Sequence, residues 1–380
     1  MFSTKKRLTG VVAMMLGLAL AGAACGDSGS KASTSPTTTK ATTTATTAQA
    51  ATTTKPADVT GTLNGSGSTF AKPFYDQLIT DFKKVQPKAT INYGGGGAGQ
   101  GRTDLQTGVV DFAGSDGLVA AADVSKYKGP FLYFPTMAAP ITVSYNLSGV
   151  DKLQLSPTTI AKIFDREIKT WDDPAIVAEN AAVKANLKGN IVVAHRSDSS
   201  GTTQNFTLFL DKSAGTGGSG VWKLKSGSTV EWPADTQAGN GNAGVSQIVK
   251  STNGAIGYID LSDAKASGLK FASIMNKAGK YVDPTLAGTS AAVSVTPINA
   301  DLSYDPIWAD GDAAYPIATP TWILVYVTQS DKAKGETIKA FLRYVYGDGQ
   351  KTAPTIDYAP LPQAVVDKAV AQIDKIVVPA

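Results

Sequence analysis

The chain has 380 residues, with 35 Lys and Arg against 31 Asp and Glu. This length allows more than one folded domain. Three of the basic residues, Lys5, Lys6 and Arg7, lie in a leader-like N-terminus, and without them 32 basic residues face 31 acidic ones. A nearly neutral chain offers no electrostatic basis for binding nucleic acid, so we expect no nucleic-acid partner.

The first residues have the pattern of a secretory signal. Basic residues 5–7 precede the mostly apolar stretch Leu8–Leu20, and small residues follow as far as Ala24. The apolar stretch is shorter than a typical transmembrane helix, and no second apolar stretch of spanning length follows. We therefore predict a signal peptide over residues 1–24.

Cys25 follows these small residues and is the only cysteine, which excludes an intramolecular disulfide. The arrangement resembles the lipobox of bacterial lipoproteins, whose cysteine is acylated, for example with palmitate. Gly22 departs from the larger aliphatic residue that is usual there. We expect Cys25 to be a lipid anchor. The alternative is an ordinary signal peptide that ends near a cysteine.

Residues 25–58 are mostly Thr, Ala, Ser and Lys, with almost nothing apolar to bury. Such a composition favours a flexible tether. The Thr tract, flanked by Pro36 and Pro56, also suits O-glycans, which the sequence does not decide.

From residue 59 onward, apolar runs of strand type alternate with helical spacing, which predicts an α/β fold. The predicted strands are Ile91–Tyr93, Val109–Gly114, Ile141–Asn146, Ile191–His195, Ala255–Asp260 and Trp322–Thr328. One predicted helix begins at Ser156, with Pro157 in its first turn. The other helices are predicted from the apolar positions Phe70, Phe74, Leu78 and Phe82, then Phe206, Phe209 and Leu210, then Ile338, Phe341, Leu342 and Val345.

Four small polar segments fall at such strand-to-helix corners: Gly65–Phe70, Gly94–Gly101, Phe112–Asp116 and His195–Thr202. Glycines allow close approach of a ligand, and free N–H groups at helix starts attract anions. Ser and Thr hydroxyls add hydrogen-bond donors, and the guanidinium of Arg196 adds a positive charge that can bind an anion through two hydrogen bonds. Each segment alone is typical of a turn or helix cap. Together they predict an oxyanion site beyond the strand ends.

These segments, in this order and spacing, resemble those of the PstS family, the phosphate-binding proteins of phosphate-specific ABC transporters. The resemblance covers residues 59–380 and extends to Trp171–Pro174, Gly254–Tyr258, Tyr315–Ile317 and Tyr358–Pro362. It implies a protein that binds inorganic phosphate and delivers it to the ABC permease subunits of an importer. It implies no enzyme activity, no cofactor and no metal ion.

The resemblance also implies an α/β, two-lobe periplasmic-binding-protein fold of type II, in which each lobe is a helix-covered, mainly parallel sheet. Lobe I would comprise residues 59–136 plus 315–380, and lobe II residues 137–314. The hinge between the lobes would lie near Pro135–Pro140 and Ala314–Pro320. We expect a monomer, anchored by lipid on the extracytoplasmic face of the cell membrane.

The family's phosphate-binding residues map onto Thr69, Phe70, Ala98, Asp116, Arg196, Ser200, Gly201 and Thr202. Asp198 is similar to the residue that holds the arginine in place, and Ser68 is expected to support the site. Ala98 departs from the family, which has a serine there. The lost hydroxyl would cost roughly 1–3 kcal/mol of binding, or less if water or the backbone N–H of Ala98 or Gly99 substitutes.

Asp116 implies selectivity for a protonated anion. Monohydrogen and dihydrogen phosphate carry a proton that a carboxylate can accept, whereas sulfate carries none at neutral pH. Sites built around a substrate hydroxyl reject analogues that lack it by on the order of 10^4–10^5. The simpler interpretation is that Asp116 caps a turn or pairs with a lysine.

Other classes of function are compatible with parts of the sequence. His195, Asp198 and Ser200 are the residue types of a serine hydrolase. However, no Gly-x-Ser-x-Gly elbow is present, and the three residues crowd into one short segment. We therefore expect His195 to have a packing role. A receptor for sulfate, molybdate or a phosphonate is a second alternative, and a sensor or adhesion role is a third.

Overall fold

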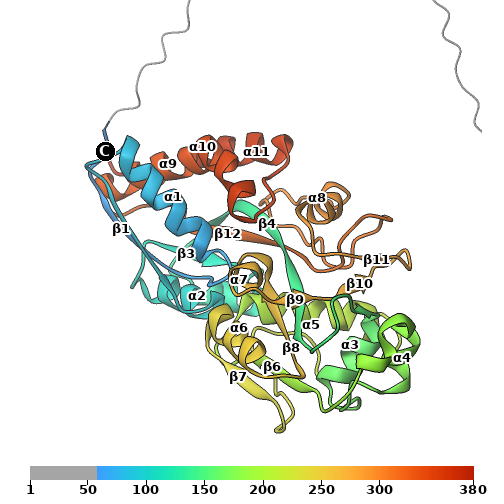
Figure 1. Cartoon of the computed structure of the whole chain (residues 1–380). Coiled ribbons are helices and arrows are strands. Elements are labelled where there is room, and N and C mark those ends of the chain that lie inside the picture. The colour runs from blue at the N-terminus through green and yellow to red at the C-terminus, as the bar shows by residue number, and fades with distance from the viewer. Residues whose placement is uncertain (1–57) are drawn as a thin grey trace, which may run out of the picture. The chain divides into compact units, whose positions relative to one another are not determined.

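The computed structural model describes residues 58–380 (Figure 1). The predicted signal peptide, Cys25 and all but the last residue of the predicted tether lie outside the described residues. Within the described part, no helix is both long and apolar enough to cross a bilayer.

One mixed sheet runs through the described residues, with a separate small sheet beside it. The order in the large sheet is β2 (Thr90–Gly95), β1 (Thr62–Gly67), β3 (Phe112–Ser115), β12 (Ala318–Tyr326), β4 (Phe131–Asn146), β8 (Ala255–Asp260), β6 (Val192–Arg196) and β7 (Gln237–Gly239), with β9 (Lys270–Phe271) on β4. The small sheet has the order β11 (Tyr281–Val282), β10 (Ser273–Met275) and β5 (Gln154–Leu155).

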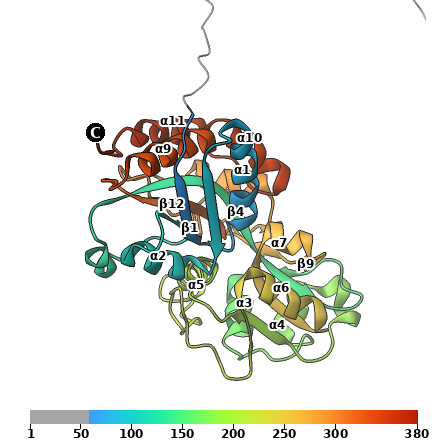
Figure 2. The ribbon, with the colours of Figure 1, turned by 90° about the vertical axis from the view of Figure 1, so that its left-hand side faces the viewer.

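The α-helices are α1 (Lys72–Val85), α2 (Ala98–Thr107), α3 (Pro157–Phe164), α4 (Pro174–Glu179), α5 (Gly201–Ala214), α6 (Gly241–Ser251), α7 (Leu261–Ala266), α8 (Leu286–Ser294), α9 (Lys332–Tyr346), α10 (Asp348–Thr352) and α11 (Gln363–Ile373). Short 3-10 helices are η1 (Ala121–Lys126), η2 (Ala181–Asn186) and η3 (Ala353–Ile356). In both views α1, α9, α10 and α11 gather around the half of the sheet that contains β1, and α3, α4 and α6 lie with the other half (Figures 1 and 2).

The long strand β4 joins the two halves of the sheet. Its residues Phe131–Pro140 pair antiparallel with β12, and Ile141–Asn146 pair antiparallel with β8. The change of partner falls at Pro140, which has no N–H to donate to a ladder. The next amide, that of Ile141, donates to the carbonyl oxygen of Ile317 at 3.0 Å, just before β12 begins.

The outer strands have the predicted parallel arrangement. Strand β1 is parallel to β2 and β3, and β6 is parallel to β7 and β8. In the large sheet, every antiparallel pair of described strands involves β12 or β4, which lie near its middle. This is the two-lobe fold predicted from the sequence. The exact lobe boundaries stay a prediction, and the change of pairing partner at Pro140 lies within the predicted hinge.

Local signals explain most helix starts. Ser156 accepts a hydrogen bond from the amide of Thr159, and Pro157 occupies the first turn of α3, as predicted. The structure differs for Phe70, which lies before α1 rather than on its apolar stripe. Strand β1 was not predicted, because its sequence, TLNGSG, has little of the β-branched and aromatic character that marks strands.

A cluster of aromatic rings holds the half of the sheet that contains β6. The ring of Phe206, on α5, stacks on Tyr258 with centroids 4.4 Å apart and tilts against Phe164 at 4.7 Å. All three side chains are fully buried. Because α5 begins at the predicted polar segment His195–Thr202, this packing also fixes where the segment lies.

Replacing Phe206 with alanine should therefore destabilise the protein strongly. A large cavity in a packed aromatic cluster costs about 3–5 kcal/mol of unfolding free energy. Chemical denaturation of phosphate-free Phe206→Ala protein would measure this loss. Val370→Ala, at an exposed position of α11, is the control and should change stability by less than about 1 kcal/mol. Similar losses in both variants would contradict the packing role.

Candidate functional site

The first three predicted polar segments leave one edge of the sheet side by side. Gly67 at the end of β1 is in register with Gly95 of β2 and with Gly114 of β3. Because these strands are parallel, the residues that follow each of them emerge at the same edge. The fourth segment follows β6 in the other half of the sheet and opens α5.

Close backbone packing brings the fourth segment against the second and third. A Cβ placed on Gly201 would lie 2.7 Å from both Cβ and Oδ2 of Asp116 and 3.1 Å from Cβ of Ala98. Only glycine tolerates such an approach. In addition, the amide of Gly99 donates to the carbonyl oxygen of Ser199 at 3.0 Å. The two halves of the sheet therefore touch at the predicted site.

Several backbone amides at this junction have no protein acceptor among residues 58–380: those of Thr69, Phe70, Ala98, Gly201 and Thr202. Ala98 and Gly201 are the first residues of α2 and α5, where intrahelical acceptors are lacking. The amide of Ser200, by contrast, donates to the carbonyl oxygen of Ser228 at 2.8 Å. The amide of Gly99 is also engaged, whereas Ala98 offers a free N–H in the glycine-rich segment. Free amides at helix starts are the kind of group that attracts anions.

Arg196 is buried at the end of β6 and is paired with Asp198. Its Nε donates to Asp198 Oδ1 at 2.8 Å, and its Nη2 contacts Asp198 Oδ2. Burial alone would raise the pKa of Asp198, but the hydrogen bonds and charge of Arg196 hold that pKa below its ordinary value. The guanidinium also donates from Nη1 to Thr202 Oγ1 at 3.3 Å.

Asp116 is almost completely buried, with 2% of its surface exposed. Its Oδ1 accepts from Thr321 Oγ1 at 2.8 Å and from the hydroxyl of Ser68. Burial raises the pKa of this carboxyl, whereas the two hydroxyl donors and the charges of Arg196 and Arg102 act in the opposite direction. With Oδ1 occupied, Oδ2 is the oxygen that lies beside Gly201.

Two residues of the site were missed by sequence reasoning. Thr321 lies where the pairing of β12 with β4 shifts register, and a bulge of this kind re-aims side chains. Asn242 lies at the start of α6, and its Nδ2 donates to Thr69 Oγ1 at 3.3 Å and to Thr202 Oγ1 at 3.4 Å. A further strand-to-helix corner, Gly239–Asn242, was the available signal, but the three-residue strand β7 before it is too short to recognise.

The structure does not support a hydrolase triad. Ser200 Oγ accepts from the amide of Thr203 and caps α5. His195 stacks on Trp232 with centroids 5.0 Å apart, and its Nδ1 lies 2.9 Å from the carbonyl oxygen of Arg196. Among the described residues His195 and Ser200 share no hydrogen bond, and Asp198 is engaged with Arg196 rather than with the histidine. His195 is packed against an aromatic ring, as expected.

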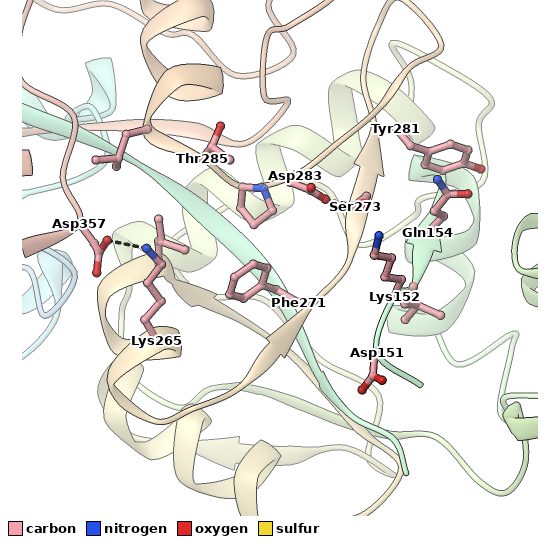
Figure 3. Close-up of a pocket in the computed structure, with 14 residues that line it drawn as sticks. Asp151, Lys152, Gln154, Lys265, Phe271, Ser273, Tyr281, Asp283, Thr285 and Asp357 are labelled. Carbon is pink, nitrogen blue, oxygen red and sulfur yellow. Dashed lines mark hydrogen bonds and ion pairs between the residues drawn. The ribbon is translucent and has the colours of Figure 1, made fainter. Parts of the chain in front are cut away.

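A cavity of about 660 Å³ lies elsewhere, between α7 and the segment that joins β11 to α8 (Figure 3). Phe271 and Tyr281 contribute to its wall, and the ion pair between Lys265 and Asp357 (2.6 Å) lies at one side. None of the predicted phosphate-binding residues lines it. A smaller cavity of about 320 Å³ has Thr69 and Asn242 in its wall.

The fold and the site define a two-lobe solute-binding protein. In agreement, a family model described as a PBP superfamily domain matches residues 33–349. A solved structure of similar fold is that of a high-affinity periplasmic phosphate-binding protein (PfluDING) bound with phosphate. It has a TM-score of 0.67 and 23% identity, over 82% of this chain and 93% of that one.

Sequence relatives define the family more narrowly. The phosphate-binding protein PstS of Pasteurella multocida (strain Pm70) is 32% identical over 318 residues, which are 82% of this chain and 89% of that protein. The phosphate-binding protein PstS of Methanocaldococcus jannaschii is 36% identical over 310 residues, which are 75% of this chain and 78% of that protein. The chain belongs to the PstS family of phosphate-binding proteins.

The burial of Asp116 gives a testable effect on stability. Because its pKa is raised in the folded protein, the folded state holds its proton more tightly than the unfolded state. Below the ordinary carboxyl pKa of about 3.9, Asp116 is protonated in both states and its ionisation does not affect stability. As the pH rises through the folded pKa, the buried carboxyl must ionise, and the phosphate-free protein loses stability. We expect Asp116→Asn to raise the unfolding free energy at pH 7 by on the order of 1 kcal/mol.

This gain should shrink as the pH is lowered toward 4, in denaturant titrations of phosphate-free protein at several pH values. Asp172→Asn removes an exposed carboxylate instead and should show little change. A gain that is constant with pH would mean that Asp116 is not the titrating group.

Proposed function

We propose that this protein binds inorganic phosphate in the closed site between its two lobes and delivers it to an ABC importer. The observation that carries the proposal is the cluster of free backbone amides around Arg196 and Asp116. A tetrahedral oxyanion needs many donors from several directions, and these amides point to such a ligand without requiring net positive charge.

The donors proposed for phosphate come from both lobes. Thr69 and Phe70 would supply backbone amides, and Ala98 a third. Gly201 and Thr202 would supply the amides at the start of α5. The hydroxyls of Thr69, Ser200 and Thr202 would donate, and Arg196 would add charge-assisted hydrogen bonds. Ser68 and Asp198 would support the site through the contacts they make to Asp116 and Arg196.

Asp116 is proposed to accept the proton of the bound phosphate through Oδ2. Its other oxygen already accepts from Ser68 and Thr321, so the free oxygen is the one available to a ligand hydroxyl. A fully ionised anion such as sulfate would meet this buried carboxylate with no proton between them. Repulsion of that kind favours phosphate over a general oxyanion receptor.

Closure of the lobes is proposed to depend on the ligand. Lobe I would comprise residues 59–136 and 315–380, and lobe II residues 137–314. Thr69 and Asp116 belong to the first lobe, and Arg196 and Thr202 to the second. A phosphate bound to both sides would stabilise the closed state, because only contacts that differ between states can shift the equilibrium.

The cellular setting follows from the proposed transport role. We propose an extracytoplasmic, monomeric protein, held at the cell membrane by acylated Cys25 and docking on the permease subunits when loaded. No catalytic activity is required of it. A Ser200→Ala change that abolished ester hydrolysis by the purified protein would instead support the hydrolase alternative.

Calorimetric titration would test the binding proposal. Phosphate-stripped protein should bind phosphate and discriminate against sulfate by at least about 10^4-fold. In Asp116→Asn protein the carboxylate is gone, so that discrimination should fall by roughly 100-fold or more. Absence of phosphate binding by the parent protein, or unchanged discrimination in the variant, would contradict the proposal.

Ala98→Ser should strengthen phosphate binding, because it adds a hydroxyl donor at the start of α2. One added hydrogen bond worth about 1–2 kcal/mol corresponds to roughly 5–30-fold tighter binding. Ala340→Ser on α9 is the matched control and should leave the affinity unchanged. Weaker binding by Ala98→Ser protein would show that the position has no room for a ligand hydroxyl.

A further inference from the structure

Asn242 joins the two halves of the site through a single amide group. It lies on α6 and is fully buried. Its Nδ2 donates to Thr69 Oγ1 at 3.3 Å, which comes from the segment after β1, and to Thr202 Oγ1 at 3.4 Å on α5. Its Oδ1 is buried and has no donor among the described residues.

The direction of these hydrogen bonds determines where the hydroxyl protons of Thr69 and Thr202 can point. A side-chain amide nitrogen carries two hydrogens and cannot accept, so both threonine oxygens act as acceptors toward Asn242. Thr202 Oγ1 also accepts from Arg196 Nη1 at 3.3 Å. With both lone pairs of Thr202 Oγ1 engaged, its own hydrogen is available only for donation to a further acceptor.

Asp198, the carboxylate that holds Arg196, also holds the residue before Asn242. The amide of Gly241 donates to Asp198 Oδ1 at 3.0 Å, and Gly241 has a positive φ of 66° that suits glycine. Asp198 therefore anchors both Arg196 and the first residue of α6. Hydrogen bonds link Asp198 to Arg196, Arg196 to Thr202 and Thr202 to Asn242, and the amide of Gly241, the residue before Asn242, closes this ring by donating to Asp198.

We propose that Asn242 is a positioning residue of the phosphate site, whose amide turns the hydroxyl protons of Thr69 and Thr202 toward the bound anion and ties the two lobes in the closed state. The inference rests on the proposed function. It assigns Asn242 no direct contact with phosphate and predicts that its effect passes through the two hydroxyls.

An isosteric change reverses the hydrogen-bond direction. In Asn242→Asp protein the introduced carboxylate accepts from both threonines, which turns their protons away from the anion and adds a repelling charge. At pH 8 we expect the dissociation constant for inorganic phosphate to rise by roughly 100-fold or more relative to the parent. At pH 5 the introduced carboxyl is partly protonated because it is buried, and the ratio should fall to about tenfold or less.

Asn240→Asp is the matched control. Asn240 is exposed, two residues away at the cap of the same helix, and shares no hydrogen bond with either threonine in the described structure. The same added charge should there change the affinity by less than about threefold at every pH, since exposed charges are screened. Full-length, phosphate-stripped proteins would be titrated calorimetrically with inorganic phosphate at pH 5, 6.5 and 8, and each variant compared with the parent at the same pH.

A double-mutant cycle separates positioning from packing and does not depend on the aspartate variant folding. Asn242→Ala should weaken phosphate binding about tenfold in the parent, but less than about threefold when Thr69→Val and Thr202→Val are already present. Equal losses in the two backgrounds, or equal effects of Asn242→Asp and Asn240→Asp, would overturn the inference. Failure of the parent to bind phosphate would instead refute the proposed function.

Discussion

The buried ion pair between Arg196 and Asp198 is the interaction on which the site depends. A guanidinium this deeply buried needs a partner, because an isolated charge in a protein interior is costly. Asp198 neutralises it and at the same time accepts from the amide of Gly241. One carboxylate therefore fixes the arginine at the end of β6 and the start of α6. The donors that surround the arginine are placed relative to this pair.

Neutralising the arginine has a consequence for recognition. Arg196 is balanced by Asp198, and Asp116 adds a further carboxyl whose burial raises its pKa. The site therefore does not attract an anion by excess positive charge. In the proposed function an anion is held by directed amide and hydroxyl donors, which are sensitive to the shape and protonation of the ligand. This arrangement favours selectivity over simple charge attraction.

The shared strand β4 explains how the site can be assembled from two halves. Its first part is paired with β12 and its second part with β8, and the change occurs at Pro140. Asp116 lies beside β12, through Thr321, whereas Arg196 ends a strand next to β8. Movement at the junction would therefore separate the acceptor of the site from its cation. A ligand that contacts both is placed to resist that separation.

The sequence alone determined the fold class and the four polar segments, because apolar periodicity, helix caps and glycine clusters are local signals. Residues 1–57, with Cys25, remain a matter of sequence pattern. Only the tertiary structure decided which amides are free, since that depends on partners such as Ser199 and Ser228 that lie on other segments. It also decided the positions and hydrogen bonds of Asn242 and Thr321 and the existence of β1. Those features arise from pairing between distant parts of the chain, and such pairing leaves no pattern in the local sequence.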